Sequence, residues 1–298
     1  MNYMVAVPLN KALAEFIGKK GSENGITFYN RRVDDNVIVV LAPTDMDEKV
    51  YGLMESMLIA GQVVISTESV DKSLGETLIA ASLLDKRLII TDENDIGAIL
   101  SGTSIKNFEI CTREELLGKI TSQASDSSGT ARVDIDKAFN VKGIGTVALG
   151  VVTSGTVKVH DSMQTPSGKQ ITIKSIQSQD QDIGSAGVHT RVGLALKGVE
   201  SDELDKGDIL SAKPVRRIRK FRTTLRMGGF AKEAIEGSRN YLIAIGFSHS
   251  EGKLEMSGDA ATITLAKPVS MEVGDRLLVA RSAAPRIFAS GKVEELIE

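Results

Sequence analysis

The chain has 298 residues, of which 42% are apolar and 25% are charged, and this composition fits two or three globular domains. A formal net charge of -3 excludes a histone-like polybasic protein. One cysteine and three histidines exclude a cysteine-rich zinc scaffold and an internal disulfide, and the lack of tryptophan argues against a platform for stacked bases.

The N-terminus does not resemble a secretory signal, because no basic segment precedes its apolar stretch and Lys11 and Glu15 interrupt it. No run reaches the roughly 18 apolar residues that a membrane-spanning helix needs. The sequence therefore predicts a cytoplasmic protein without a membrane partner.

Residues 1–120 alternate between two hydrophobic patterns. Strand patterns at 4–7, 37–42, 63–66 and 88–91 alternate with helical patterns at 9–17, 50–58, 74–84 and 112–120. In the first helical pattern Leu9, Leu13, Phe16 and Ile17 share one face, and in the last one Thr112 and Glu115 form a capping box. Such alternation predicts an α/β domain with a parallel sheet, which we call the front domain.

Residues 121–130 are small, polar and without periodicity, which is typical of a linker. Short strand patterns separated by glycine-containing turns follow at 131–138, 144–153, 155–160, 170–176, 190–197 and 208–211. After Pro214 a second series occupies 216–227, 240–247, 261–266, 276–281 and 286–295. We therefore expect two antiparallel β-barrels, the middle barrel at 131–212 and the C-terminal barrel at 213–298.

The charges are distributed unevenly over these three parts. Residues 1–125 carry 12 basic and 18 acidic side chains, residues 126–212 carry 9 and 11, and residues 213–298 carry 15 and 10. The net charges are therefore -6, -2 and +5, which sum to the -3 of the whole chain. A nearly neutral protein thus combines an acidic front domain with a basic C-terminal barrel.

Residues 139–161 read FNVKGIGTVALGVVTSGTVKVHD, and this stretch resembles the second domain of translational GTPases. The likeness is greatest to selenocysteine-specific elongation factors and to elongation factor Tu. It continues in order through PSGKQ at 166–170, IKSIQ at 173–177, RVGLALKG at 191–198 and KGDIL at 206–210. Residues 235–237, Gly246, Gly252 and residues 285–293 resemble the third domain more loosely. The resemblance implies that residues 1–120 correspond to the GTP-binding domain.

The phosphate-binding loop of that domain is missing from this sequence. A P-loop needs Gly-x-x-x-x-Gly-Lys-Ser/Thr between the first strand and helix, so that backbone N–H groups can surround the phosphates. Here the segment reads VPLNKAL at 7–13, which lacks both glycines. Lys11 by itself cannot replace the ring of N–H donors. We therefore expect a degenerate P-loop GTPase-like domain.

Two further nucleotide motifs have changed. Where the family has Asp-x-Pro-Gly, this chain has Leu41-Ala-Pro43-Thr44, and the following histidine of the family is Asp45 here. Where the family has Asn-Lys-x-Asp, this chain has Asp92-Glu93-Asn-Asp95. Asp95 and Thr27, which matches the threonine that binds magnesium in the family, are the remaining matches. We expect Asp92, Glu93 and Asp95 to form a solvated loop rather than a metal site.

A basic cluster begins the C-terminal barrel, with no acidic residue among its members Lys213, Arg216, Arg217, Arg219, Lys220, Arg222 and Arg226. Strand alternation predicts that Arg217 and Arg219 share one face. It predicts that the opposite face carries Arg216, Lys220, Arg222 and Arg226. Arginine suits RNA phosphates, so residues 216–226 are a candidate nucleic-acid site. The equally weighted alternative is salt bridging to the acidic front domain.

No catalytic residue, cofactor or metal ion is expected. His160, His189 and His249 lie too far apart for a metal motif, and Cys111 lacks a histidine partner. The resemblance implies an elongation factor-like protein that binds tRNA, ribosomal RNA or a translation partner without hydrolysing GTP. The alternatives are an active GTPase with an atypical nucleotide site and a protein-binding scaffold unrelated to RNA.

Overall fold

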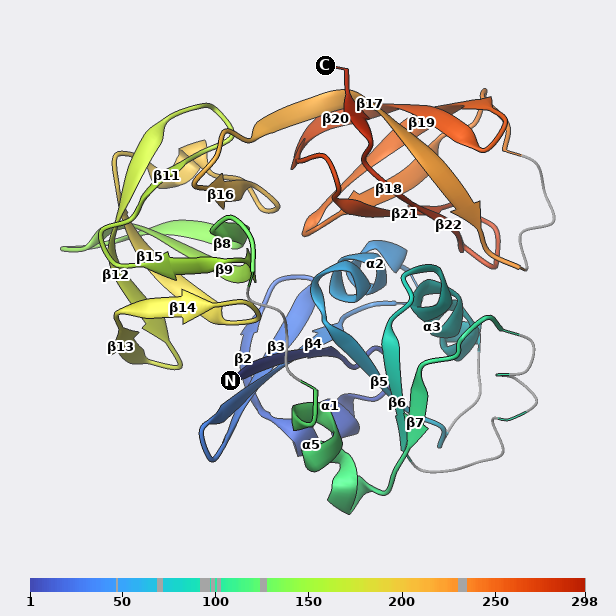
Figure 1. Cartoon of the computed structure of the whole chain (residues 1–298), viewed down its shortest axis with the longest axis horizontal. Coiled ribbons are helices and arrows are strands. Elements are labelled where there is room, and N and C mark those ends of the chain that lie inside the picture. The colour runs from blue at the N-terminus through green and yellow to red at the C-terminus, as the bar shows by residue number, and fades with distance from the viewer. Residues whose placement is uncertain are drawn as a thin grey trace.

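A computed structural model of the chain describes residues 1–46, 48–68, 72–91, 97, 100, 103–123, 128–229 and 235–297. It consists of an α/β front domain and two antiparallel barrels that both contact it (Figure 1). The predicted fold class is therefore confirmed. In the described part of the chain, no helix combines the length and the apolar character required to cross a membrane.

The front domain is built on a mixed sheet. Its strands are β1 (Asn2–Ala6), β2 (Lys19–Glu23), β3 (Ile26–Val33), β4 (Asn36–Pro43), β5 (Gln62–Ser66), β6 (Arg87–Thr91) and β7 (Phe108–Ile110), in the spatial order β2-β3-β4-β1-β5-β6-β7. Strands β4, β1, β5 and β6 are parallel, as predicted, and β7 adds a further parallel strand that was not predicted. Strands β2 and β3 add an antiparallel edge that was not predicted, because β2 is exposed throughout and has no apolar pattern.

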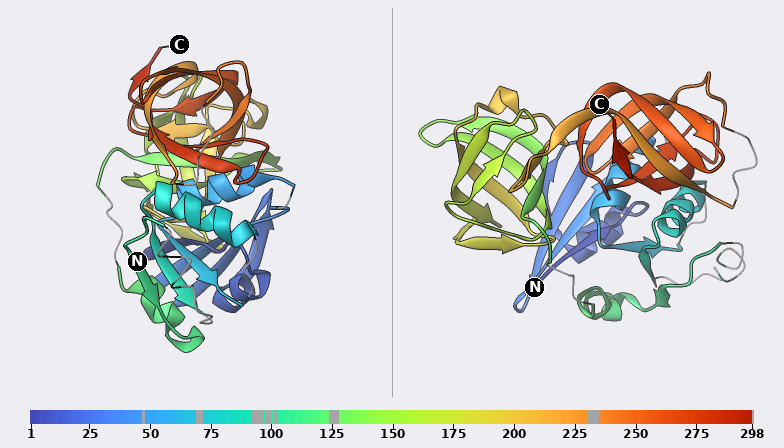
Figure 2. Two further views of the ribbon diagram at one scale, coloured as in Figure 1. Left: turned by 90° about the vertical axis from the view of Figure 1, so that its right-hand side faces the viewer. Right: turned by 45° about the horizontal axis from the view of Figure 1, so that its top comes forward.

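Helices cover both faces of this sheet (Figure 2). They are α1 (Lys11–Ile17), α2 (Val50–Ile59), α3 (Lys72–Leu83) and α5 (Arg113–Thr121). Helices α1 and α5 pack on one face and α2 and α3 on the other, since successive strand residues point to opposite sides. The predicted Thr112–Glu115 capping box is confirmed. Phe16, in contrast, is 40% exposed rather than on the buried face of α1, and Leu9 precedes the helix.

The middle barrel closes on itself through the pairing of β11 with β12. Its elements are β8 (Arg132–Val141), β9 (Gly145–Ser154), β10 (Thr156–Lys158), β11 (Ser162–Gln164), β12 (Gln170–Ser178), β13 (Gln181–Ile183), β14 (Ser185–Gly187), β15 (Arg191–Lys197), the 3-10 turn Ser201–Glu203 and β16 (Ile209–Ser211). The six predicted strands are present, and β11, β13 and β14 are short additions of 3 residues each.

The C-terminal barrel closes through β17 and β20. Its strands are β17 (Arg216–Met227), β18 (Tyr241–Ile245), β19 (Ser248–Ser257), β20 (Ala260–Met271), β21 (Arg276–Ala280), β22 (Ile287–Lys292) and β23 (Glu295–Leu296). Strand β19 was not predicted. Its inward positions include Ser248, Ser250 and Gly252, so the period-2 pattern exists in burial but not in hydrophobicity.

The three parts share one hydrophobic core. The cluster between the sheet and helices α2 and α3 also contains Val151 of the middle barrel and five residues of the C-terminal barrel, Ala244, Phe247, Leu278, Ala280 and Ile287. Apolar burial therefore opposes separation of the front domain from the barrels.

Gly207 lies where the middle barrel meets the C-terminal barrel. Its φ is +85°, and a Cβ atom would lie 2.8 Å from the backbone nitrogen of Ser248. We expect Gly207→Ala to lower the free energy of unfolding by about 3 kcal/mol, since it adds a steric clash to the left-handed backbone strain. Urea unfolding measures the loss. Gly258 is the matched control because its φ is +63° with nothing near its Cβ position, so Gly258→Ala should cost about 1 kcal/mol. Equal losses would contradict the clash.

Candidate functional sites

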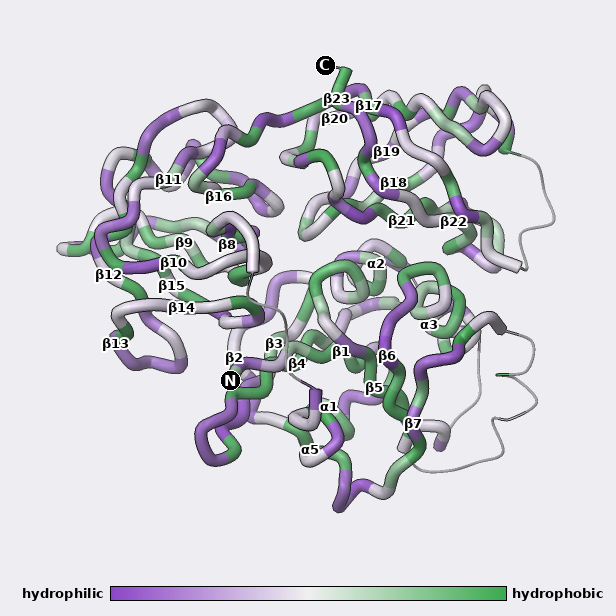
Figure 3. The backbone as a smooth tube through the Cα atoms, in the orientation of Figure 1, coloured by the Kyte–Doolittle hydropathy of each residue, from purple (hydrophilic) through white to green (hydrophobic). Residues whose placement is uncertain are grey.

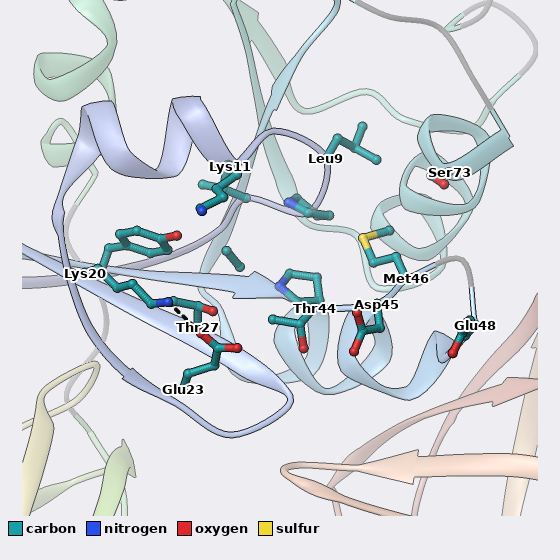
Figure 4. A pocket seen from close by; sticks show the side chains of 15 residues that line it. Leu9, Lys11, Lys20, Glu23, Thr27, Thr44, Asp45, Met46, Glu48 and Ser73 are labelled. Carbon is teal, nitrogen blue, oxygen red and sulfur yellow. Dashed lines mark ion pairs between the residues drawn. The ribbon is translucent and has the colours of Figure 1, made fainter.

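A cavity of about 730 Å³ lies in the front domain, beside the ends of strands β1, β3 and β4 (Figure 4). Its lining includes Lys11, Thr27, Thr44 and Asp45, which are positions assigned to the altered nucleotide motifs. Segments far apart in the sequence thus meet here, as the resemblance implies. Leu41 is fully buried in the core, and Asp92, Glu93 and Asp95 lie outside the described residues.

Two N–H groups that flank the turn between β1 and α1 are bonded within the protein. The Val7 nitrogen donates to the Leu41 carbonyl at 2.9 Å, and Pro8 has no N–H. The Leu13 nitrogen donates to the side chain of Asn10, the N-cap of α1, at 2.9 Å. A phosphate at this turn would therefore lack the convergent donors that a P-loop supplies.

The segment at Gly25, which leads into Thr27, and the segment at Thr44 bond directly to each other. Both the backbone nitrogen and the Oγ1 of Thr44 donate to the carbonyl oxygen of Gly25, at 3.1 Å and 3.0 Å. Thr27 lies in β3, opposite Ala42 of β4, and is 4% exposed. The Thr44–Gly25 hydrogen bonds therefore link the two segments directly.

Carboxylates outnumber lysines around the cavity. Lys20 Nζ lies 2.7 Å from the Glu23 carboxylate, so its charge is balanced, and Lys11 lies 3.6 Å from Glu15. The hydrogen bond from Lys20 lowers the pKa of Glu23, and the same bond raises the pKa of Lys20. Asp45 and Glu48 line the other side (Figure 4). Lys20 and Glu48 belong to no sequence motif, so nothing in the sequence pattern marks them as lining residues.

The basic cluster lies on β17 and faces outward. Arg216, Arg217, Arg219 and Arg222 are exposed and Lys220 is half-buried, whereas Ile218 and Phe221 point into the barrel. The prediction of two opposite faces was therefore wrong. A register shift between Ile218 and Lys220 places Arg219 and Lys220 on the same side. Figure 3 shows the largely hydrophilic tube of β17.

Ion pairs hold three of the six candidate residues. Arg217 bonds to Asp208 and Asp205 of the middle barrel, at 2.5 Å and 2.9 Å. Arg222 bonds to Glu295 at 2.7 Å within its own barrel. Arg226 reaches Asp85 of the front domain at 2.8 Å. The cluster thus contributes one salt bridge to the front domain, as the alternative reading proposed.

The other three residues form part of a larger basic surface. Arg219 donates to the carbonyl of Ala266, and no ion pair to Arg216 or Lys220 is found in the described part of the chain. Thr264 of β20 pairs with Lys220 on one side and with Lys253 on the other. Lys267 follows Ala266 and is exposed. We call this set, Arg216, Arg219, Lys220, Lys253 and Lys267, the outer basic surface.

A half-buried basic group lies where the front domain meets the barrels. The Lys86 ammonium donates to the Ala60 carbonyl, and burial, helped by nearby Arg276, lowers the pKa of Lys86 to about 8. His189 lies against Gly61, and burial, helped by Lys86, lowers its pKa to about 4. Among the described residues, no group of three or more His, Cys, Asp or Glu is arranged to hold a metal ion.

Lys86 should make the free energy of unfolding vary with pH in the alkaline range. Its folded pKa of about 8 lies below the ordinary lysine value of 10.5, so the unfolded chain binds more protons between these values. We expect the free energy of unfolding to rise across this window by at most about 3 kcal/mol. Urea titrations from pH 7.5 to 10.5 test this, with Lys86→Met as the variant that should lose the rise. An unchanged pH profile in Lys86→Met would contradict it.

Comparisons with known proteins agree with this architecture. The family description of elongation factor Tu domain 2 matches residues 145–211. Uncharacterized protein MJ0325 of Methanocaldococcus jannaschii is 31% identical over 291 residues, which cover 93% of this chain and 94% of that protein. The selenocysteine-specific elongation factor of the same organism is 38% identical over 92 residues, 30% of this chain and 20% of that protein.

Solved structures extend the likeness to the whole fold. The crystal structure of translation elongation factor SelB from Methanococcus maripaludis, in its apo form, has a TM-score of 0.83 at 18% identity and covers 100% of this chain and 80% of that one. The same factor with the GTP analogue GPPNHP also has a TM-score of 0.83, at 18% identity, covering 100% of this chain and 79% of that one.

Proposed function

Since this chain belongs to the translational GTPase family, we propose that it is an elongation factor-like protein that binds tRNA or ribosomal RNA in the cytoplasm without using GTP. The proposal separates two properties. The barrels provide the binding surface, and the front domain neither binds GTP tightly nor hydrolyses it.

The outer basic surface is the observation that carries the RNA proposal. Its five cations lie on the adjoining strands β17, β19 and β20 of the C-terminal barrel, whose arrangement Figure 1 shows. Cations without carboxylate partners are available to phosphates, whereas Arg217 and Arg222 are already paired. The low aromatic content favours contacts with the RNA backbone over base stacking.

The lost GTPase activity is supported by three features of the cavity. The N–H groups of Val7 and Leu13 beside the turn after β1 are bonded within the protein, the segments at Gly25 and Thr44 bond directly, and carboxylates exceed lysines along the described lining. Phosphoryl transfer depends on positioned donors, magnesium ligands and a held water. Of the cavity-lining residues at those positions, Thr27 alone keeps the family's residue type, and it matches a single magnesium ligand.

The RNA proposal predicts a steep salt dependence that originates in the outer basic surface. Filter binding to bulk tRNA and to ribosomes is measured from 50 to 300 mM KCl for the wild type and for Arg216→Ala/Arg219→Ala/Lys220→Ala. We expect the triple variant to bind more weakly and its log-log salt slope to fall by about 2–3, roughly one per lost phosphate contact.

A charge-matched control variant distinguishes RNA binding at the outer basic surface from nonspecific attraction of RNA to any exposed cation. Lys19→Ala/Arg32→Ala/Lys106→Ala removes three exposed front-domain cations and should leave the slope unchanged. Equal binding by the wild type and the β17 variant would reject this surface as the RNA site. Binding to neither tRNA nor ribosomes would favour a protein-binding scaffold.

A further inference from the structure

Glu55 of helix α2 joins the front domain to both barrels. Its side chain is 0% exposed, yet Oε2 lies 2.7 Å from Nζ of Lys206 in the middle barrel. Its other oxygen, Oε1, lies 2.7 Å from Nδ1 of His249 in the C-terminal barrel. The ring of Tyr51, one turn earlier on α2, stacks on His249 with a centroid distance of 4.2 Å. One buried carboxylate therefore holds one group from each barrel.

Glu76 of helix α3 makes a second link to the C-terminal barrel. It accepts from the backbone nitrogen of Arg286 at 3.0 Å, from Nε at 2.9 Å and from Nη2 at 2.6 Å. The same guanidinium donates to the carbonyl of Met46 at 2.8 Å. Since Glu76 is 5% exposed, separating the domains would break a buried, multiply hydrogen-bonded ion pair.

The barrels are also joined to each other. Nη1 of Arg132, in the middle barrel, lies 2.5 Å from Asp275 and 3.2 Å from Glu272 of the C-terminal barrel. Asp208 accepts from Arg217 and from the hydroxyl of Ser270, both across the same joint. The shared apolar core and these polar links therefore connect the front domain to each barrel and the two barrels to each other.

We infer that the front domain serves as a fixed clamp that sets the relative position of the two barrels independently of nucleotide. Two features carry the inference. Helices α2 and α3 each carry a buried carboxylate, Glu55 and Glu76, whose ion-pair partners among the described residues lie in the barrels, and the Thr44–Gly25 hydrogen bonds join the cavity segments next to α2. The clamp gives the front domain a role within the proposed function, because it would hold the outer basic surface in one position relative to the middle barrel.

Small-angle X-ray scattering of the full chain tests the clamp without RNA. The wild-type profile should be the same in buffer, with Mg-GTP and with Mg-GDP. Glu55→Gln/Glu76→Gln should increase the radius of gyration, while far-UV circular dichroism stays at the wild-type level. If the double variant does not fold, Glu55→Gln alone, which keeps the side-chain volume, should give a smaller increase.

The control removes ion pairs that lie within single domains. Glu109→Gln/Glu203→Gln breaks the pairs with Arg87 and Lys169, and it should leave the radius of gyration unchanged. A nucleotide-dependent profile, or a folded clamp variant with the wild-type profile, would overturn the inference. Because RNA is absent, a failure of RNA binding with the expected scattering would reject the proposed function and leave the clamp intact.

Discussion

Mg-GTP at 1 mM is expected to leave the melting temperature of this protein unchanged. A ligand that binds the native state with micromolar affinity would stabilise it by about 4 kcal/mol at that concentration. For a chain of this size such stabilisation corresponds to a rise of about 6 °C. The expected absence of a shift follows from the capped turn at Asn10 and from the excess of carboxylates around the cavity. Thermal unfolding followed by circular dichroism measures it.

The thermal unfolding experiment needs a nucleotide control and a protein control. Mg-ATP at the same concentration serves as the nucleotide control, and a translational GTPase with an intact P-loop serves as the protein control. A rise of several degrees with GTP and none with ATP would reject the proposed loss of nucleotide binding. It would favour an active GTPase that uses Thr27 in an atypical site.

The architecture was predictable wherever burial and hydrophobicity coincide. Strands β5 and β6 read as continuous apolar runs, and the middle-barrel strands are bounded by turn glycines such as Gly143 and Gly168, both with positive φ. Strand β19 was missed because serine and glycine occupy its inward positions. Strand β2 was missed because all of its residues are exposed. Small or polar residues at strand positions carry no periodic signal.

The sites were predictable only in part. The family motifs correctly brought Lys11, Thr27 and Thr44 to one cavity, because they mark the ends of neighbouring strands. The partners of Glu55 lie 151 and 194 residues away, and no spacing rule connects them. The outward position of both Arg219 and Lys220 depends on a register shift that alternation cannot anticipate.

Phe247→Ala is expected to lower the free energy of unfolding by about 3–5 kcal/mol, the usual cost of removing a buried phenylalanine side chain. Phe247 is 1% exposed and belongs to the core shared by the three parts. Its ring lies 6.2 Å from that of Phe28 in the front domain, and the guanidinium of Arg191, from the middle barrel, lies 3.9 Å above the Phe28 ring. Urea unfolding followed by circular dichroism measures the loss.

Urea unfolding also distinguishes the core shared by the three parts from the separate core of the C-terminal barrel. Because Phe247 connects the parts, we expect the single wild-type transition to broaden or split in Phe247→Ala, as cooperativity between domains is lost. Phe221 is equally buried, but it lies in the separate core of the C-terminal barrel. Phe221→Ala should therefore destabilise that barrel without changing its link to the front domain. If Phe247→Ala keeps a sharp single transition while Phe221→Ala splits it, the domains are coupled through something other than this core.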